Sequence, residues 1–330
     1  MSYICRLLFF FCFIQTIVDA QTIFFLKPAH ILPAFDSSRQ YFAQSKRDIP
    51  IGEVDESNFG LLPNYTWNHV VDSLASNEKL FSLQRHGEGW HNVARRYLNI
   101  SYHDWQCHWS LVDGKDGIEW YDAELTPRGK KQVASLAHKI KHTDEFPFPL
   151  RFYVSPLRRT LQTWLGTWQN LTSKIPTIKE NAREKYGIDS ESKRHEKEYI
   201  VAKFPNEFTF EPYFSEFDDK WSLEEREKLQ HCRYRAATLL RDIFKEVTDN
   251  EKVISVVSHS GIIYCILDVV QHRYYGLYTA GLIPVIVKME RETKLYPLDD
   301  AFSNFTDWCP SHFTSETYIE QMVSEKENEY

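Results

Sequence analysis

Long apolar runs, basic stretches and cysteines are all scarce in this chain of 330 residues. The apolar stretch from Leu7 to Ile14 is much shorter than the roughly 20 residues that a membrane-spanning helix needs. The formal net charge of -7 comes without a basic stripe, which argues against a nucleic-acid partner. The C-terminus has no hydrophobic segment of the kind that signals a lipid anchor. We therefore expect a globular protein that binds neither nucleic acid nor the membrane interior.

The six cysteines are too few for a disulfide scaffold, so the fold is expected to rest on a hydrophobic core. Residues of the hydrophobic class make up 42% of the chain, which is enough for one large domain or two. Cys107, Cys232, Cys265 and Cys309 lie beyond the first 20 residues, and one or two bridges among them are compatible with the sequence. Cys265 lies within an apolar run, and we expect it to be a buried thiol rather than a bridge or a metal ligand.

The first 20 residues have the layout of a secretory signal peptide, with cleavage expected after Ala20. A membrane anchor is the alternative, but Gln15, Thr16 and Asp19 interrupt the apolar run. Four Asn-x-Ser/Thr sequons agree with secretion, at Asn64, Asn99, Asn170 and Asn304. We expect a glycoprotein of the secretory pathway (extracellular, cell wall or vacuole) without stable membrane insertion, and exposed turns at Asn99 and Asn170.

Beyond the signal peptide, the composition predicts three further parts. Residues 21–60 lack sustained periodicity and are expected to form an extended arm that lies over the domain. Residues 61–298 are expected to form the folded domain, and residues 299–330 an acidic C-terminal tail.

Strand and helix patterns alternate along the folded domain. Strands are predicted at residues 79–84, 150–154 and 253–257, and helices at residues 92–98, 127–141, 157–168, 222–243 and 262–270. Thr126 before Pro127 predicts one helix start, and a capping box of Ser222 and Glu225 predicts another. The alternation favours an α/β fold, a three-layer α/β/α sandwich around a mostly parallel central sheet.

Three polar clusters follow predicted strands: Arg85-His86, Ser155 to Arg159, and Ser258 to Gly261. Open α/β sheets bind ligands outside the carboxyl ends of their strands. The three clusters are therefore expected to meet in one site.

These clusters resemble a known pattern. Arg85-His86-Gly87 with Asn92, seven residues after the arginine, resembles the phosphohistidine signature of the histidine phosphatase superfamily, the phosphoglycerate mutase-like enzymes. The remaining blocks follow in the family's order: Leu125-Thr126-Pro127, Val154 to Thr160 with Thr163, Arg183-Glu184 with Gly187, and Ser258 to Gly261. The resemblance covers about Phe81 to Val287, and the tryptophan-containing segments at residues 109–111 and 120–122 are most similar to the fungal phosphomutase-like branch.

The resemblance implies a role for each residue of the site. His86 is the nucleophile, Glu184 the proton donor, and His259 a second histidine that stabilises the transferring phosphoryl group. Phosphate is expected to be bound by Arg85, Asn92, Arg158 and His259. Arginine forks grip phosphate oxygens bidentately, and Arg159 beside Arg158 is interpreted as a solvated charge. Glu180 and Glu88 are alternative acids, and Arg183 either contacts the substrate or pairs with Glu184 on the surface.

No metal or other cofactor is expected. His86 with His91, and His103 with Cys107 and His108, lack the H-E-x-x-H spacing and the paired C-x-x-C arrangement of metal sites. The predicted function is hydrolysis of small phosphomonoesters through a phosphohistidine. A phosphoglycerate mutase-like phosphomutase is the first alternative, and a glycoprotein that binds phosphorylated ligands without turnover is the second. Residues 185–220 are interpreted as either a substrate cap or a packed surface lobe.

Overall fold

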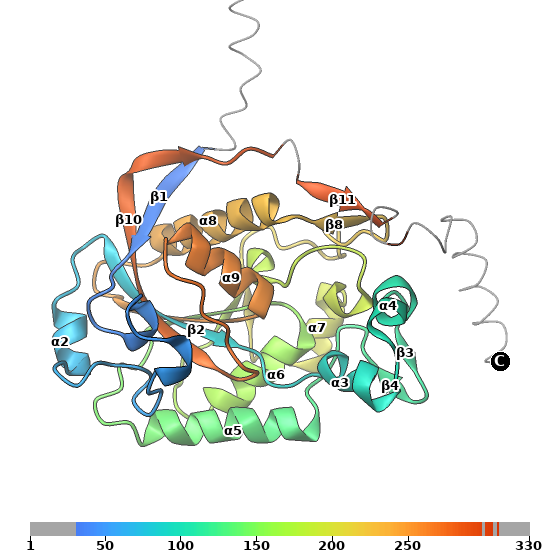
Figure 1. Ribbon diagram of the computed structural model, residues 1–330, viewed down its shortest axis with the longest axis horizontal. Helices are drawn as coiled ribbons and strands as arrows, with labels where there is room; N and C mark the ends of the chain where they lie inside the picture. The colour runs from blue at the N-terminus through green and yellow to red at the C-terminus, as the bar shows by residue number, and fades with distance from the viewer. Residues whose placement is uncertain (1–30, 299–300, 306–308, 310–330) are drawn as a thin grey trace, which may run out of the picture.

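A seven-stranded sheet forms the centre of the computed structural model, which describes residues 31–298, 301–305 and 309 (Figure 1). Across the sheet the order is β1 (Ile31–Ser37), β10 (Leu282–Leu295), β2 (Glu78–Arg85), β9 (Val253–Ser258), β5 (Arg151–Val154), β6 (Thr177–Ile178) and β7 (Thr209–Phe210). β10 is antiparallel to both of its neighbours, and the pairs from β2 to β7 are all parallel. The sheet is therefore mostly parallel, as predicted.

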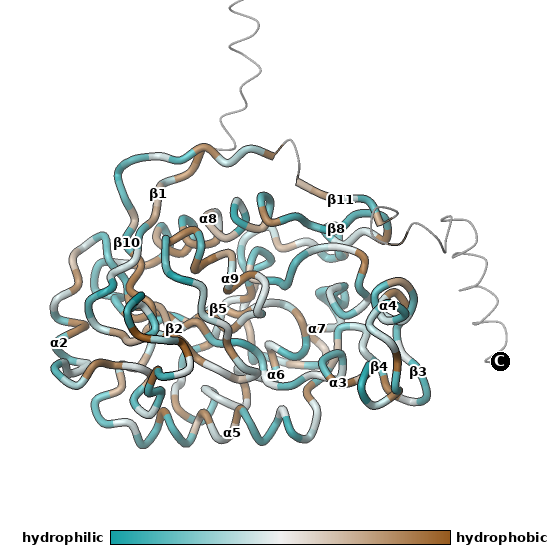
Figure 2. Tube along the Cα trace, in the orientation of Figure 1, coloured by the Kyte–Doolittle hydropathy of each residue, from teal (hydrophilic) through white to brown (hydrophobic). Residues whose placement is uncertain are grey.

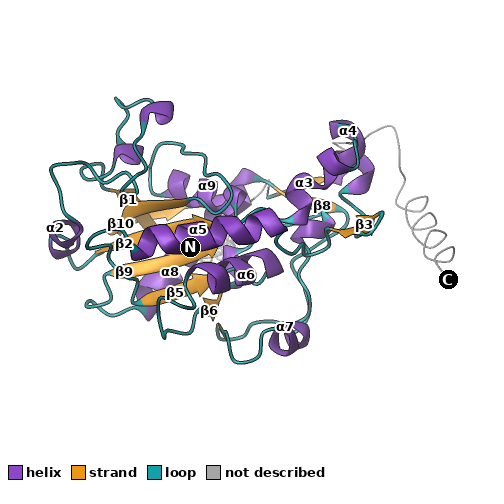
Figure 3. Cartoon of the chain, turned by 90° about the horizontal axis from the view of Figure 1, so that it is seen from below, coloured by secondary structure: helices purple, strands orange, loops and turns teal. Residues whose placement is uncertain are grey.

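Helices cover both faces of this sheet. One face packs against α8 (Leu229–Glu246) and α9 (Ser260–Val269), and the other against α5 (Pro127–Lys141) and α6 (Arg158–Thr167). Figure 1 places α8 and α9 above the strands and α5 below them, and in Figure 3, seen from below, α5 lies in front of the strands. The three-layer α/β/α sandwich is thus confirmed.

Shorter elements lie around the three layers. The helices are α2 (Trp67–Asp72), α3 (Trp90–Tyr97), α4 (Tyr102–Asp104) and α7 (Lys197–Lys203), with a π-helical turn at Trp105–Trp109 and 3-10 turns at Ala43–Ser45, Ile51–Glu53, Glu180–Ala182 and Ser190–Ser192. Two small sheets pair β3 (Gly114–Lys115) with β4 (Ile118–Glu119), and β8 (Glu225–Glu227) with β11 (Phe302–Asn304).

The alternation of side chains along the strands explains why both faces are covered. In β2, Phe81 and Leu83 pack into the core under α8 and α9, whereas Leu80 packs into the core on the other face. All six residues of β9 are buried, as is typical of a strand with helices on both sides. In Figure 2 the brown, hydrophobic colour continues along α9, while α5 alternates with hydrophilic teal because its outer face meets solvent.

Residues 31–60 differ from the predicted arm. β1 pairs with β10 at the edge of the central sheet, and its Leu32 and Phe35 belong to the core beside α8. Phe42 and Phe59 are buried with Trp67 in the core on the other face. This part of the predicted arm therefore belongs to the fold instead of lying over it. Residues 1–30, which include the predicted signal peptide, lie outside the described residues.

Two helix starts were predicted from capping residues, with different outcomes. α5 begins as predicted, because the Thr126 hydroxyl accepts the Gly129 N–H and proline occupies the first helical position. Ser222 also accepts the N–H of Glu225, but no helix follows, and α8 begins only at Leu229. Pairing of β8 with β11, far along the sequence, overrides the local capping signal. β11 also shows that the start of the predicted tail is part of the fold.

Two disulfides join Cys107 to Cys309 and Cys232 to Cys265. The prediction of a buried free thiol at Cys265 is wrong, although the residue is buried. α8 and α9 pack side by side and place Cys232 opposite Cys265, a tertiary contact that the apolar run around Cys265 does not reveal.

The four sequons are all exposed, and Asn99 and Asn170 lie in turns as expected. Across the described ranges, no helix combines the length and apolar character that crossing a membrane requires.

Candidate active site

His86 and His259 lie together at the carboxyl edge of the parallel sheet. Arg85 and Ser258 are register partners in β2 and β9, and the N–H of His86 donates to the Ser258 carbonyl at 3.0 Å. The two imidazole rings that follow have centroids 5.1 Å apart, and both side chains are buried. The predicted meeting of these two clusters is confirmed, and the end of β5 joins them through Ser155, whose hydroxyl lies 2.8 Å from His259 Nε2.

The protonation of His86 follows from its hydrogen bond. Its Nδ1 lies 2.7 Å from the carbonyl oxygen of Gly87, which can only accept, so Nδ1 carries the proton and Nε2 has a free lone pair. Burial first, and then the charges of Arg159 and Arg85, hold the pKa of His86 well below its usual value. The imidazole is therefore neutral at neutral pH, which is the state that a nucleophile requires.

Arg158 does not lie in this cluster. Its Nε donates to the Asp122 carbonyl at 2.6 Å, and its terminal nitrogens contact Glu119, Glu124 and the carbonyl of Tyr121. Every nitrogen of the guanidinium is therefore engaged by residues 119–124. The structure does not support Arg158 as a phosphate ligand, because its fork is already bound to carboxylates and carbonyls.

Arg159, the next residue of α6, is the arginine whose charge acts on the imidazoles. Its side chain is fully buried, and its charge is the largest electrostatic contribution after burial to the lowered pKa of His86, His91 and His259. One terminal nitrogen donates to the Glu191 carbonyl at 2.7 Å, and Nε is buried without a partner. Helical spacing could have identified it, because Arg159 and Thr163 share one face of α6 and the Thr163 hydroxyl accepts the N–H of Gly87.

Arg85 approaches the cluster from the end of β2. Its guanidinium donates to the carbonyl of Leu277 at 2.8 Å, which fixes the side chain, while Nε is buried and unpartnered. The charge of Glu184 raises the pKa of Arg85 against the larger effect of burial, which shows that this carboxylate is close. Arg85 and Arg159, rather than Arg85 and Arg158, are the two arginines of the site.

The Glu184 side chain contacts the first turn of α9, the helix that His259 precedes. Its carboxylate accepts the N–H of Gly261 at 3.2 Å and that of Lys185 at 3.0 Å. A Cβ at position 261 would lie 2.1 Å from the Glu184 carboxylate, so glycine is needed for this close approach. The loop from residue 180 thus brings Glu184 to the sheet edge that carries both histidines.

The two alternative acids are engaged elsewhere. Glu88 accepts the Thr126 hydroxyl at 2.8 Å and pairs with Arg128 at the start of α5. Glu180 pairs with Arg183 at 2.6 Å and with Arg194 at 3.0 Å. These contacts explain Glu88 and Glu180 as structural residues, and the proton-donor role of Glu184 stays a prediction.

Buried arginines fix the loop that carries Glu184. Arg183 is buried and pairs with Glu180 and Asp218, so it is not the surface partner of Glu184, and its charge is neutralised within the protein. Arg235 pairs with Glu227 and donates to the carbonyls of Asn181, Arg183 and Glu184. Glu184 is therefore held by its own loop and by α8.

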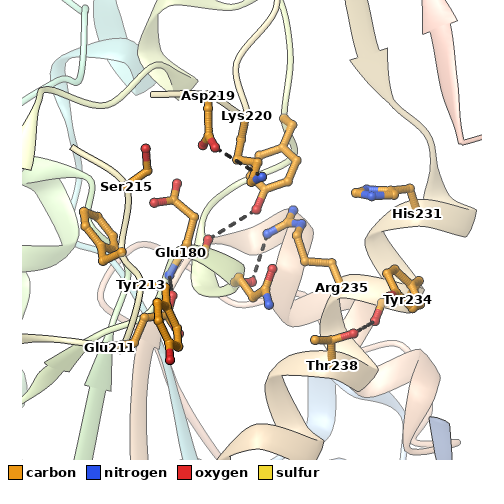
Figure 4. Close-up of a pocket in the computed structure, with 13 residues that line it drawn as sticks. Glu180, Glu211, Tyr213, Ser215, Asp219, Lys220, His231, Tyr234, Arg235 and Thr238 are labelled. Atoms are coloured by element: carbon orange, nitrogen blue, oxygen red, sulfur yellow. Dashed lines mark hydrogen bonds and ion pairs between the residues drawn. The ribbon is translucent and has the colours of Figure 1, made fainter. Parts of the chain in front are cut away.

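A pocket of about 400 Å³ lies beside this loop, with Glu180 and Arg235 among its lining residues (Figure 4). Its charged side chains are paired within the protein: Glu211 with Lys179, Asp219 with Lys220, and His231 with Glu227. The pocket lining contains neither His86 nor His259. We interpret the side chains that line this pocket as residues that stabilise the Glu184 loop.

The aromatic segment at residues 185–220 is packed in part, since Phe204 and Phe214 belong to the core on the α5 and α6 face. Phe217 and Tyr213 are exposed. Phe204 and Phe214 therefore fit the prediction of a packed lobe, whereas the exposed Tyr213 and Phe217 do not decide between a lobe and a substrate cap.

Asn92 is close to the cluster but is engaged in capping α3. Its amide oxygen accepts the N–H of Gly89 at 3.0 Å, and its nitrogen lies 2.9 Å from Nε2 of His91. His91 in turn faces His86, with ring centroids 5.2 Å apart. The sequence motifs do not indicate that His91 faces His86, and its spacing from His86 fits no metal site.

Glu191 is a second residue near the site that no sequence motif indicates. It lies in the 3-10 turn at Ser190–Ser192, and its backbone carbonyl accepts a hydrogen bond from Arg159. Burial, and then the charge of Asp189, raise the pKa of its carboxyl to about 8.

The electrostatic character of the site suits a phosphoryl group. Four buried nitrogens of the cluster have no hydrogen-bond partner: Arg85 Nε, Arg159 Nε, His91 Nδ1 and His259 Nδ1. Buried donors are almost always paired, so this concentration of unpartnered nitrogens around His86 indicates an anion with several acceptor oxygens. In the described part of the chain, no group of three or more His, Cys, Asp or Glu side chains is arranged to hold a metal ion.

Comparison with known proteins agrees with this arrangement. The family model described as "Histidine phosphatase superfamily (branch 1)" matches residues 108–277, which include Arg159, Glu184 and His259 but not His86. "Phosphomutase-like protein 3" of Candida albicans is 56% identical over 88% of this chain and 91% of its own length. A "Probable phosphoglycerate mutase" of Arthroderma benhamiae is 35% identical over 81% of this chain and 82% of its own.

Among solved structures, a phosphoglycerate mutase from Bacillus anthracis covers 71% of this chain and 96% of its own, with a TM-score of 0.43 and 14% identity. The family match and the fungal relatives have one consequence: the chain belongs to the histidine phosphatase superfamily, in its fungal phosphomutase-like branch.

Proposed function

We propose that this protein hydrolyses small phosphomonoesters through a phosphohistidine at His86. Members of its family are phosphatases or mutases. The observation that carries the proposal is the set of unpartnered nitrogens around His86, supplied by Arg85, Arg159, His91 and His259. They can donate to the equatorial oxygens of a phosphoryl group while Nε2 of His86 stays free to attack phosphorus.

The first step forms a bond between His86 Nε2 and phosphorus and breaks the bond between phosphorus and the ester oxygen. The leaving oxygen departs with the electron pair of that bond and takes a proton from the carboxyl of Glu184. The positive charges of Arg85 and Arg159 stabilise the negative charge of the transferring phosphoryl group. The products of this step are the free alcohol and phosphohistidine.

The second step returns the enzyme to its starting state. The Glu184 carboxylate takes a proton from water as the water oxygen bonds to phosphorus and the bond to His86 Nε2 breaks. Inorganic phosphate leaves, and both His86 and Glu184 recover their original protonation. The sequence of steps needs neither an oxidant nor a metal ion for its balance of atoms and charge.

The test is His86→Ala. We expect it to abolish phosphate release while near-UV circular dichroism stays unchanged, because the imidazole adds little apolar area to the core. The wild type should also be labelled by a ³²P-phosphomonoester at His86 in a bond that is stable to alkali and labile to acid. Substantial turnover by His86→Ala, or labelling at another residue, would refute the nucleophile assignment.

A phosphomutase is the second candidate, because relatives at 35% and 29% identity carry the name "Probable phosphoglycerate mutase". A mutase must keep water away from phosphohistidine and return the phosphoryl group to a second hydroxyl. With ³²P-labelled phosphoglycerate we expect inorganic phosphate to be the main product. Label that appears mainly in an isomeric phosphoglycerate would favour the mutase.

The two disulfides and the four exposed sequons support a location in the secretory pathway, where oxidising conditions preserve disulfides. The small phosphorylated substrate would then be met outside the cytosol.

A further inference from the structure

His91 faces His86 from the first turn of α3, as close as His259 does from the other side. The ring centroids of His86 and His91 are 5.2 Å apart, and those of His86 and His259 are 5.1 Å apart. Gly89 makes room for the His91 ring, since a Cβ on residue 89 would lie 2.7 Å from His91 Nδ1. The backbone of the loop is therefore shaped around this third imidazole.

The hydrogen bonds of Asn92 determine which nitrogen of His91 carries a proton. The amide oxygen of Asn92 accepts the Gly89 N–H at 3.0 Å, so the group facing His91 is the amide nitrogen, which can only donate. It lies 2.9 Å from Nε2 of His91, and Nε2 must accept this bond. In a neutral ring the proton is then on Nδ1.

The charge state of His91 is fixed by its surroundings. Burial first, and then the charges of Arg159 and Arg85, hold the pKa of His91 well below its usual value. Arg159 from α6 and Arg85 from β2 thus both disfavour a positive charge on His91. His91 is a neutral imidazole whose Nδ1–H is buried without a partner.

We propose that the Nδ1–H of His91 binds an oxygen of the transferring phosphoryl group, and that Asn92 is a positioning residue that sets the His91 tautomer. This inference rests on the proposed function, in which phosphate lies beside His86. A neutral donor adds a hydrogen bond to the dianion without becoming charged as the pH falls. In this arrangement one Asn92 side chain does two things: its oxygen caps α3, and its nitrogen sets the His91 tautomer.

The experiment measures inhibition by inorganic phosphate in the wild type, His91→Phe and His91→Asn. Phenylalanine keeps a ring but removes the donor, whereas the asparagine amide nitrogen can replace Nδ1. We expect the inhibition constant to rise about tenfold to a hundredfold in His91→Phe, the range for a hydrogen bond to a charged group, and to recover partly in His91→Asn. His142→Phe is the matched control, because His142 is exposed at the far end of α5, and it should leave phosphate inhibition unchanged.

A second measurement keeps the inference testable if His91→Phe fails to fold. Nitrogen-15 NMR of histidine-labelled wild type should show His91 as the neutral Nδ1–H tautomer, and Asn92→Asp should abolish that state because a carboxylate cannot donate to Nε2. An Nε2–H tautomer in the wild type would overturn the inference. So would phosphate inhibition that is unchanged in His91→Phe while the wild type still labels at His86, a result that leaves the proposed function intact. A wild type that neither binds phosphate nor labels at His86 would overturn the proposed function itself.

Discussion

Arg158 and Arg159 are neighbours with the same side chain, but the first turn of α6 directs them to different surroundings. Arg158 is held by Asp122, Glu119 and Glu124, so its charge is neutralised by protein carboxylates. Arg159 lies against the imidazoles with Nε unpartnered. The charge of Arg158 is neutralised by its neighbours, so Arg159 is the arginine that can bind a phosphate ligand.

Substitutions at these two positions should therefore have different effects. Arg159→Lys keeps the charge but loses the bidentate fork, so kcat/KM for phosphomonoesters should fall by about tenfold to a hundredfold with little change in stability. Arg158→Ala removes the guanidinium from buried Asp122, which keeps His195 as a partner, and leaves the carbonyls of Tyr121 and Asp122 without their donor, so it should lower the free energy of unfolding by about 1–3 kcal/mol. Steady-state kinetics and urea unfolding of both variants measure the contrast. An activity loss confined to the Arg158 variant, at unchanged stability, would restore Arg158 as the phosphate ligand.

The proton donor can be tested at the same scale with Glu184→Gln. If Glu184 protonates the leaving oxygen, alkyl phosphates should lose about 10² or more in the phosphoryl-transfer rate, and aryl phosphates should lose less because their leaving groups need little protonation. Rapid-quench measurement separates this step from water attack on phosphohistidine. Glu191→Gln is the matched comparison, since burial raises the pKa of the Glu191 carboxyl and its backbone carbonyl binds Arg159. A stronger leaving-group dependence in Glu191→Gln would move the acid role to that residue.

At the scale of elements, α8 stabilises the Glu184 loop through the buried pair of Arg235 and Glu227. Arg235 binds the carbonyls of Asn181, Arg183 and Glu184, and Glu227 neutralises Arg235 at 2.7 Å. Arg235, followed by hydrogen bonds from His231 and Arg235, lowers the pKa of Glu227 to about 2 against the opposing effect of burial. The charged form of Glu227 is thus part of what keeps the loop in place.

This shift predicts how stability depends on pH. The pKa of Glu227 is lower in the folded state than in the unfolded state, so its contribution is present above pH 4.5 and is lost as the pH falls toward 2. A shift of this size corresponds to roughly 3 kcal/mol. Urea unfolding between pH 2 and pH 7 should show a weaker acid-induced loss of stability in Glu227→Gln, which starts from a lower value at pH 7. Glu224→Gln, an exposed neighbour, should follow the wild-type curve. If Glu227→Gln also follows it, the buried pair does not contribute to acid sensitivity.

At the scale of the whole molecule, local patterns predicted most elements but not the contacts between distant segments. The strand before His259 was predictable because a buried parallel strand is a short continuous apolar run, and the strand before His86 because Phe81 and Leu83 alternate with their neighbours. The edge strand β1, the pairing of β8 with β11 and the bridge from Cys232 to Cys265 were not, since each depends on a partner far away in the sequence. The choice between Arg158 and Arg159 failed for a related reason, because one residue of helical rotation decides which arginine faces the site.

The two disulfides tie together distant parts of the chain, and they connect the fold to its compartment. Cys107 and Cys309 are 202 residues apart, so their bridge links the segment after α3 to the end of the described chain. A disulfide that closes a long loop restricts the unfolded chain strongly, and it persists only in an oxidising compartment.

We therefore expect the natural protein to begin at Gln21, to carry N-glycans at exposed sequons and to contain no free thiol among its four mature cysteines. N-terminal sequencing, a glycosidase gel shift and thiol titration of unfolded, unreduced protein check the three parts. A cytosolic, unglycosylated chain that retains Met1 and titrates four thiols would contradict secretion, and the substrate would then have to be sought among cytosolic phosphomonoesters.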